Sequence, residues 1–591
     1  MGHVAIRPGL PRTAKGAARG RLARIWIAAL ALTRHPAVLA GIVLATLAVV
    51  WQLENDPAAV PFAMAVWTLL AALALLASGR RAFAVAAATS TVLAISAVSF
   101  LKYRFKGFSL HYHDVLFSGT DPEALAFLWS VYRPMILPVV ALVAIGMAVC
   151  ILLCRAHAPN RRDRFIGGAG MLAAIVALPL AYPVKAGEPR YFYYLQGRHV
   201  SAFFVSLLDL EYLFQENELE ARLAALGPRP ATPAAATACQ GERPDLLVVL
   251  SESQVDPRTV PGLPVAAATA ARLEAANGPL RPLQVESFGG GTWITTLSFM
   301  TGLSAWDFGW RAPYLTVTLE DRVRRALPEA LAACGYRSVA LLPMHRGFVN
   351  EGAFLSSIGF ETVLDRHDIG AEHYHLRDRF YLDAASRFVE RHRREDGRPL
   401  FLYVQTMFAH SPYEERALPD IKVPGEPLAA SAQRAEYLRR LVIARSDLAA
   451  FARRERARAP DRGLVLMDFG DHHPMATAPL LERAPGGLAL ADPGSAAYRT
   501  FHTVSRADGA WRLRTGPDDV PDIAFLASRL LKAAGVRPGA PWDSLARLDA
   551  ACSGRMHRCR DRSLVDAHLR QRVDAGWLRL DGVSAASPPS R

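Results

Sequence analysis

Five apolar runs in the first third of the chain are each close to the length that a helix needs to cross a lipid bilayer. A bilayer core is spanned by about 20 mostly apolar residues, and the runs cover residues 36–53, 58–78, 82–100, 134–154 and 166–183. Five such helices would be unusual in a soluble core, and no short apolar core with a small-residue cleavage site, typical of a signal peptide, precedes a soluble chain. The sequence therefore predicts an α-helical membrane domain of five spans within residues 36–186.

Basic residues indicate which side of the membrane each connection faces. Residues 1–35 carry seven Lys or Arg and no acid, Arg80 and Arg81 follow the second run, and residues 155–164 hold four Arg against one Asp. These segments supply most of the formal net charge of +14. Because connections rich in Lys and Arg stay in the cytoplasm, we expect a cytoplasmic N-terminus (1–35) and an extracytoplasmic chain after the fifth span. The charge is a topology signal, so we exclude nucleic-acid binding.

After the fifth span the sequence changes to a pattern typical of an α/β domain. Residues 187–240 are predicted to form interfacial helices rich in aromatic residues, followed by a linker rich in Pro and Ala. Within residues 241–591, short apolar runs alternate with helical patterns, which favours a mainly parallel sheet. The expected strands are 246–250, 338–342, 400–405 and 463–467, and the expected helices are 327–334, 382–391, 432–456 and 523–534.

Polar residues follow each expected strand, where ligands collect in sheets of this kind. Glu252 follows the first strand, and Asp471 and His472 follow the last. Carboxylates and an imidazole are suitable ligands for a divalent cation. Three further histidines, His345, His410 and His473, follow strands; they are candidates to contact a substrate, with His345 and His410 able to hold a phosphate oxygen or act as general acid and base.

Three consecutive glycines, residues 289–291, precede Thr292. Glycine permits a tight turn and a close approach to an anion, and the following residues 293–303 can form a helix whose first amides face that anion. Threonine is a weak nucleophile at its free pKa, and a bound cation would lower that pKa. The competing hydroxyls lie inside the expected helix, where they bond to its carbonyls; they are Thr295, Thr296, Ser298 and Thr301. Thr292 is therefore the candidate nucleophile.

The cysteines fit an exported second half. Cys150 and Cys154 lie in the fourth apolar run, where they serve as small apolar side chains. The other four, Cys239, Cys334, Cys552 and Cys559, lie where disulfides persist. Proximity in the sequence makes Cys552 and Cys559 the expected pair, and the pairing of the other two cannot be deduced.

The order of these segments resembles the sulfatase-type membrane transferases, which include lipoteichoic acid synthases and the phosphoglycerol transferases of periplasmic glucans. The matching segments are Leu-Leu-Val-Val-Leu-Ser-Glu-Ser (246–253), Gly-Gly-Gly-Thr (289–292), Phe-Met-Thr-Gly-Leu (299–303), Gly-Tyr-Arg-Ser (335–338), Ser-Ile-Gly-Phe-Glu (357–361), His-Ser-Pro-Tyr (410–413) and Gly-Asp-His (470–472). The resemblance covers nearly the whole chain. It implies five spans followed by an extracytoplasmic α/β domain of alkaline phosphatase and sulfatase type.

The resemblance also implies roles for individual residues. Glu252, Thr292, Asp471 and His472 are expected to bind a manganese-like ion, with Mg²⁺ and Zn²⁺ as alternatives, and Thr292 is expected to be the nucleophile. Many members carry Asn-Arg-Asp after an aromatic residue, where this chain has Phe-Val-Asn-Glu at 348–351. Arg346 is the candidate replacement for that substrate-binding arginine. The formylglycine signature of true sulfatases is absent around Thr292, so the resemblance to sulfatases concerns the fold.

The implied function is transfer of the phosphoglycerol headgroup of phosphatidylglycerol to an exported glycan, through a phosphothreonine intermediate, at a bacterial cytoplasmic membrane with the catalytic domain in the periplasm. One alternative is phosphoethanolamine transfer to lipid A or a glycan by the same residues. A second alternative is a non-catalytic sulfatase-like lipid sensor or scaffold. The intact set of Glu, Thr, Asp and His disfavours that last alternative.

Overall fold

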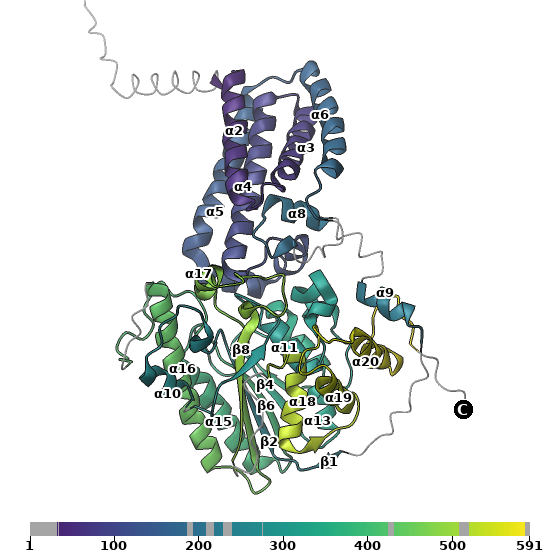
Figure 1. Ribbon diagram of the computed structural model, residues 1–591. Coiled ribbons are helices and arrows are strands. Elements are labelled where there is room, and N and C mark those ends of the chain that lie inside the picture. Colours follow the sequence, from purple (N-terminus) through teal and green to yellow (C-terminus); the bar gives the residue numbers. More distant parts are fainter. Residues whose placement is uncertain are drawn as a thin grey trace, which may run out of the picture. The chain divides into compact units, whose positions relative to one another are not determined.

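The computed structural model describes residues 32–33, 35–185, 193–207, 218–228, 239–274, 276–423, 431–507 and 519–585 (Figure 1). The chain forms two compact units, each described by itself. The first comprises Met1–Leu101, Pro134–Gly187 and Gly197–Val205, and the second comprises Lys102–Arg133, Glu188–Gln196 and Ser206–Arg591. Nearly all of the basic segment 1–35, and most of the Pro- and Ala-rich linker, lie outside the described residues.

Among the described residues, five helices are long and apolar enough to cross a membrane, as the apolar runs predict. They are α2 (Pro36–Leu53), α3 (Val60–Ser78), α4 (Arg81–Lys106), α5 (Pro122–Ala156) and α6 (Arg161–Leu180). The first unit holds α2, α3, α6, most of α4 and α5, and the short helix α8 (Val200–Ser206).

Helices α3 and α6 approach each other closely at Gly167, where an added Cβ would lie 2.5 Å from the backbone nitrogen of Leu76. Close approach at small residues is a common way for helices to associate in membranes. An ion pair of 2.7 Å joins Arg81 to Asp163. This ion pair places the second and fourth connections at the same end of the helices, as their shared basic character requires.

Two helices are longer than the sequence predicts. The expected third span ends at residue 100, whereas α4 continues to Lys106, and the expected fourth span begins at residue 134, whereas α5 begins at Pro122. The apolar runs locate only the length suited to lipid, and the hydrogen bonds of a helix continue into polar sequence. Pro134 lies inside α5. Proline removes a hydrogen bond from a helix interior and can kink the helix without ending it.

The second unit is built on a seven-stranded sheet in the order β3-β8-β7-β2-β6-β4-β5. Strands β7, β2, β6, β4 and β5 are parallel, whereas β8 is antiparallel to β7 and β3 is antiparallel to β8. The prediction of a mainly parallel sheet is confirmed, and all four expected strands are present. The bounds are β2 Asp245–Ser251, β3 Arg281–Gln284, β4 Arg337–Leu341, β5 Thr362–Leu364, β6 Leu400–Gln405, β7 Leu464–Gly470 and β8 Arg499–Arg506.

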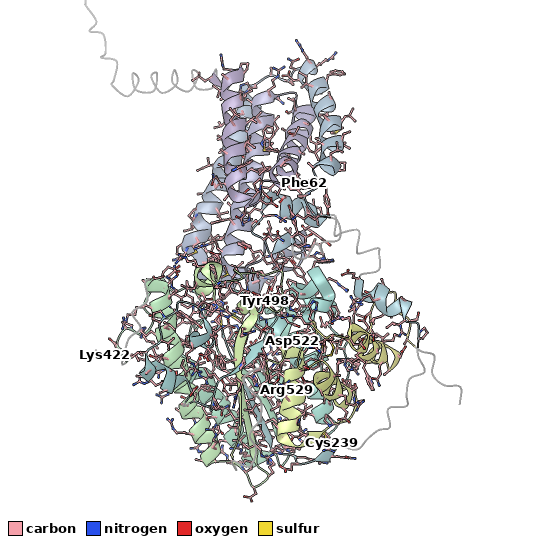
Figure 2. The ribbon with its side chains drawn as sticks, in the orientation of Figure 1. Phe62, Cys239, Lys422, Tyr498, Asp522 and Arg529 are labelled. Atoms are coloured by element: carbon pink, nitrogen blue, oxygen red, sulfur yellow. A yellow bond between two sulfur atoms is a disulfide. The ribbon has the colours of Figure 1, made fainter. Side chains whose placement is uncertain are left out.

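Helices flank this sheet, and their side chains fill the space against it (Figure 1 and Figure 2). Every residue of β2, β6 and β7 is buried. Burial on both faces explains why these strands contain continuous apolar runs. The α-helices of this unit outside α4 and α5 are α9 Glu218–Ala225, α10 Ala267–Glu274, α11 Thr292–Thr301, α12 Leu315–Thr318, α13 Leu327–Ala332, α14 Glu351–Ser357, α15 Asp378–Glu395, α16 Ala432–Ala457, α17 Ala478–Arg483, α18 Ile523–Ala534, α19 Trp542–Ala551 and α20 Arg562–Asp574.

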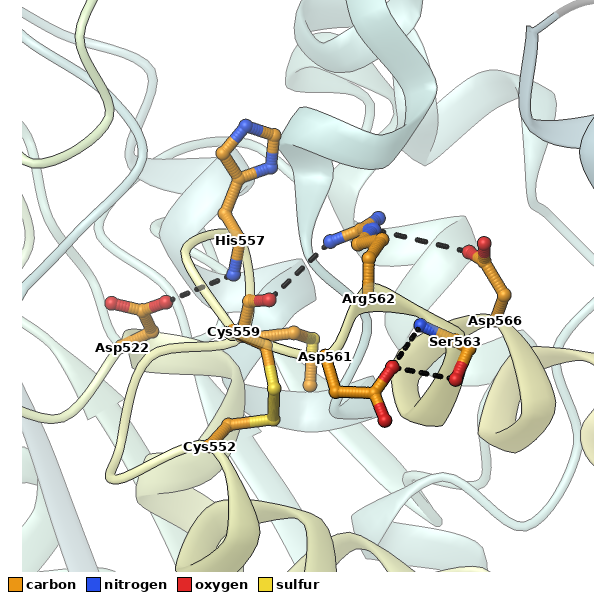
Figure 3. Close-up of a disulfide and its surroundings, with 9 residues drawn as sticks. Asp522, Cys552, His557, Cys559, Asp561, Arg562, Ser563 and Asp566 are labelled. Atoms are coloured by element: carbon orange, nitrogen blue, oxygen red, sulfur yellow. Dashed lines mark hydrogen bonds and ion pairs between the residues drawn. A yellow bond between two sulfur atoms is a disulfide. The ribbon is translucent and has the colours of Figure 1, made fainter.

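Two disulfides cross-link this unit. Cys552 and Cys559 close a short loop after α19, which confirms the expected pair (Figure 3). Cys239 bonds to Cys334, just after α13, the pairing that the sequence left open. Cys239 directly precedes β1 (Gln240–Gly241), which pairs with β9 (Val536–Arg537). The N-terminal entry to the α/β domain is therefore tied both to the end of α13 and to the strand that follows α18.

Candidate active site

The carboxyl ends of two neighbouring strands bring the expected metal ligands together. Glu252 follows β2, Asp471 and His472 follow β7, and their ligand atoms all lie within 4.8 Å of one another. His472 Nε2 is 3.2 Å from Asp471 Oδ2 and 3.4 Å from Glu252 Oε1. All three side chains are buried. Adjacent parallel strands thus turn distant sequence positions into one cluster.

The donor set fits a divalent cation. Asp471 Oδ1 accepts hydrogen bonds from the amides of Ser253 and His472 at 2.7 and 2.9 Å, which fixes the carboxylate. Asp471 Oδ2 and His472 Nε2 are buried and have no hydrogen-bond partner among the described residues. Orphaned buried polar atoms are costly. An ion bound to both atoms and to Glu252 would satisfy them.

The charges of the cluster are strongly coupled. Burial and the charge of Glu252 raise the pKa of Asp471 to about 8. Burial would lower the pKa of His472, but Asp471 and Glu252 raise it to about 9. Burial alone would raise the pKa of Glu252, yet the close approach of the charged His472 lowers it. Two buried carboxylates therefore compete for positive charge, which a divalent ion would supply.

Thr292 begins α11 with its hydroxyl on this cluster. Its Oγ1 donates a hydrogen bond of 2.7 Å to Glu252 Oε2. The preceding glycines have φ values of 74°, 156° and 90°, conformations that side chains rarely adopt. Thr292 itself is only half-buried. The Thr292 hydroxyl therefore contacts Glu252, a predicted metal ligand, and Thr292 is exposed enough for a substrate to reach it.

The other hydroxyls of α11 are committed to the protein. Thr296 and Thr301 bond to helix carbonyls, as expected. Thr295 instead donates to the Asp471 carbonyl, and Ser298 donates to Glu286. Within α11, the hydroxyl bonded to a predicted metal-ligand side chain is that of Thr292.

Two of the predicted substrate residues lie at the same edge of the sheet as the cluster, since each follows a parallel strand. His410 is half-buried, with Nδ1 3.4 Å from Nε2 of His375, and burial lowers its pKa to about 4. His345 is partly exposed, 3.7 Å from Glu123 and 3.8 Å from Asp365. Both remain candidates to contact a substrate.

Arg346 and His473 are engaged by the protein itself. The Arg346 guanidinium pairs with Asp365 at 3.2 Å and with Asp368 at 2.7 Å. Nδ1 of His473 lies 3.1 Å from the Thr477 hydroxyl, and Nε2 lies 2.8 Å from the Arg499 carbonyl. Both ring nitrogens of His473 therefore already have partners within the protein.

Residues 102–133, between the third and fourth apolar runs, belong to the same compact unit as the cluster. Lys106 Nζ lies 4.7 Å from the ring centroid of Trp293, the residue after Thr292. The Tyr132 hydroxyl is 3.2 Å from that of Ser411, and the Phe127 ring packs edge-on against His410.

The sequence interpretation missed this contribution, although a signal for it exists. Lys102 and Lys106 are basic residues on the predicted extracytoplasmic side. The charge rule leaves that side poor in Lys and Arg. Lysines there indicate a role other than topology.

Comparison with known proteins agrees with this geometry. A family model described as Sulfatase matches residues 244–484, which include Thr292 and the metal-ligand cluster. This segment is therefore similar to sulfatases, and the α/β domain that contains it is named the sulfatase domain for that similarity. The match contains strands β2 to β7, and β8 follows the matched segment.

The sulfatase domain and the membrane helices together have a solved structural counterpart. Lipooligosaccharide phosphoethanolamine transferase A of Neisseria meningitidis, an integral membrane protein, is 13% identical with a TM-score of 0.51. The match covers 88% of this chain and 98% of that chain. At this identity the likeness concerns the fold, and it agrees with apolar helices followed by an α/β domain of alkaline phosphatase type.

Two curated relatives match parts of the chain. A Rhizobium meliloti protein named for cyclic beta-1,2-glucan modification is 27% identical over 325 residues, 52% of this chain and 48% of that protein. An uncharacterized Haemophilus influenzae protein is 28% identical over 187 residues, 29% of this chain and 33% of that protein. The matches span one third to one half of the length of these relatives.

Proposed function

We propose that this chain is a metal-dependent membrane transferase that moves the phosphoglycerol headgroup of phosphatidylglycerol to an exported glycan through a phosphothreonine intermediate. The observation that carries the proposal is the contact between Thr292 Oγ1 and Glu252, which lies in one cluster with Asp471 and His472. A hydroxyl on a metal-ligand carboxylate, at a glycine turn that begins a helix, suits attack on a phosphoryl group. We propose Mn²⁺ as the ion.

The donor follows from the proposed location. We propose that the spans lie in the bacterial cytoplasmic membrane and that the sulfatase domain faces the periplasm. Phospholipid headgroups are phosphoryl donors at that surface. The named relative from Rhizobium meliloti supports a glycan acceptor. We retain residues 36–186 as the membrane domain apart from residues 102–133, which belong to the second unit. We retain 187–240 as interfacial helices and linker, and 241–591 as the catalytic domain.

The residues divide the reaction into two displacements. A divalent ion held by Glu252, Asp471 and His472 would lower the pKa of the Thr292 hydroxyl and offset charge on the phosphoryl group. Thr292 Oγ1 gives its proton to Glu252 Oε2 and attacks the lipid phosphorus. The bond between phosphorus and the diacylglycerol oxygen breaks, and that oxygen takes a proton from solvent and leaves as diacylglycerol. A glycan hydroxyl then attacks the same phosphorus and releases Thr292, whose oxygen takes its proton back from Glu252. We propose the His410 imidazole, neutral at pH 7 because burial lowers its pKa to about 4, as the group that accepts the proton of that glycan hydroxyl.

The test uses the full chain in lipid vesicles with Mn²⁺ and headgroup-labelled phosphatidylglycerol or phosphatidylethanolamine. We expect label from phosphatidylglycerol on the peptide that contains Thr292, by mass measurement, and its transfer to an added glucan. Thr292→Ala should abolish both signals. Thr301→Ala is the matched control, because that hydroxyl belongs to the same helix and bonds to the Leu297 carbonyl.

Each other outcome overturns the proposal in a defined way. Label from phosphatidylethanolamine alone would establish the phosphoethanolamine alternative. Unchanged transfer in Thr292→Ala would exclude the phosphothreonine route. A protein that binds no divalent ion and takes no label would be a lipid sensor or scaffold with a sulfatase fold.

A further inference from the structure

Lys106, at the end of α4, reaches the glycine turn that carries the candidate nucleophile. A Cβ added to Gly290 would lie 2.9 Å from Lys106 Cδ and 3.1 Å from Nζ. The ammonium also lies over the ring of Trp293, 4.7 Å from its centroid. The lysine side chain therefore crosses the turn at residue 290 and ends beside the residue that follows Thr292. A side chain at position 290 would occupy its path.

The ammonium of Lys106 is uncommitted. Among the described residues, no hydrogen bond or ion pair involves its Nζ, and the side chain is half-buried. Lys102, one helical turn earlier, contrasts with it: its Nζ donates to the Ser109 carbonyl at 2.9 Å and to Asp114 at 2.6 Å. Lys102 thus stabilises the connection between α4 and α5. The charged end of Lys106 instead lies beside Trp293, the residue after the candidate nucleophile Thr292.

A transferring phosphoryl group needs a cation beside its non-bridging oxygens. Arg346, the arginine expected from the sequence, is bound to Asp365 and Asp368 and is half exposed. The metal ligands are two carboxylates and an imidazole, so their own charge repels an incoming phosphodiester until an ion is bound. Lys106 supplies a positive charge on the Thr292 side of the cluster. Its contact with Trp293 holds the flexible side chain in position.

We propose that Lys106 Nζ binds a non-bridging oxygen of the phosphoryl group during its transfer to and from Thr292. The ammonium stays protonated and donates hydrogen bonds, so no proton or covalent bond changes at this residue. The ligand is a phosphate monoester or diester anion, whether a lipid headgroup or free phosphate. This inference rests on the function proposed above, and it places one substrate-binding residue in the connection between the third and fourth spans.

The experiment compares Lys106→Met, Lys106→Gln and Lys106→Arg in the full chain, loaded with Mn²⁺. We expect the rate of Thr292 labelling by phosphatidylglycerol to fall at least ~100-fold in the first two variants, the effect of one lost oxyanion donor, and to recover partly in Lys106→Arg. Arg104→Met is the matched control, an exposed basic residue of the same helical turn, and should stay within about two-fold of the wild type.

A second readout does not depend on turnover. Inorganic phosphate added to the metal-loaded protein should bind at least ~10-fold more weakly to Lys106→Met and Lys106→Gln, while the metal content stays unchanged. Weaker inhibition of labelling by phosphate in these variants would show that lipid and free phosphate share the site. Phosphate affinity and labelling rates equal to those of the wild type, in either variant that keeps its metal, would overturn the inference. Absence of labelling in the wild type would instead overturn the proposed function, and phosphate binding would still test Lys106.

Discussion

Two aspartates three residues apart, Asp468 and Asp471, should respond to substitution in different ways. Asp468 lies in β7 and is fully buried. Its carboxylate pairs with Arg445 of α16, which is also buried, and accepts hydrogen bonds from Thr503 and Asn277. These four residues come from distant segments of the chain. Asp468 of β7 therefore links α16, through Arg445, and β8, through Thr503, to the centre of the sheet.

The cost of breaking this pair follows from its burial. Removal of one partner leaves the other charge buried and uncompensated, which costs about 3–5 kcal/mol. We predict that Asp468→Ala lowers the free energy of unfolding of the sulfatase domain by that amount. The matched control is Arg394→Ala, which breaks an ion pair with Glu390 whose side chains are 66% and 53% exposed. Exposed pairs contribute little, so this change should cost less than about 0.5 kcal/mol.

The assay is denaturant unfolding of the full chain in detergent, followed by the fluorescence of the sulfatase domain. The double variant Arg445→Met with Asp468→Leu removes both charges, and we expect it to be less destabilised than either single change, because no charge is left alone. A cost below about 1 kcal/mol for Asp468→Ala, or full additivity in the double variant, would refute the reasoning.

Two further predictions concern charge in the same domain. Asp471→Asn and His472→Ala should each lower the bound metal from one ion per chain to near zero, measured by elemental analysis, whereas Glu390→Gln should keep it; full retention in both variants would exclude the proposed site. Glu286 is buried and accepts from Ser298, Ser304 and the Ala305 amide, and burial raises its pKa from 4.5 to about 7. Its contribution to stability is therefore fully present below about pH 4.5 and is lost as pH rises through about 7, so the unfolding free energy should fall by a few kcal/mol across that range. Glu286→Gln should flatten this fall, and an equal slope in both proteins would contradict it.

The strands that position the metal ligands could be predicted because they are buried on both faces. Such strands have continuous apolar runs, and β2, β4, β6 and β7 all do. Strand β3 (Arg281–Gln284) contains a proline, and in β8 (Arg499–Arg506) the apolar residues Phe501 and Val504 stand apart among polar residues. Neither has an apolar run, so the antiparallel edge of the sheet was missed.

The expected strand at residues 463–467 ended too early for a related reason. β7 continues through Asp468, Phe469 and Gly470, which the expected strand left out. An aspartate can occupy a central strand here because Arg445 neutralises it from α16. That partner is not close in sequence, so no local pattern reveals it. The pairing of Cys239 with Cys334 could not be predicted for the same reason, since 95 residues separate the two cysteines.

The candidate site residues that follow a strand could be predicted from the sequence, whereas Lys106, which follows a membrane span, could not. Glu252, Asp471 and His472 stand directly after β2 and β7, and Thr292 stands after the glycines. Lys106 follows an apolar run that was assigned to the membrane alone. The helix continues beyond that run, and only the structure shows which domain its last residues join.

The membership of residues 102–133 in the second unit limits how this protein can be recombined. A chimera that carries the sulfatase domain on an unrelated anchor would lose Lys106, Phe127 and Tyr132, even with every residue from 241 onward in place. Such a chimera would keep the predicted metal ligands and lack the contacts of these side chains with Trp293, His410 and Ser411. The connection and the α/β domain should therefore be exchanged as one module, with the rest of the membrane helices as the replaceable part.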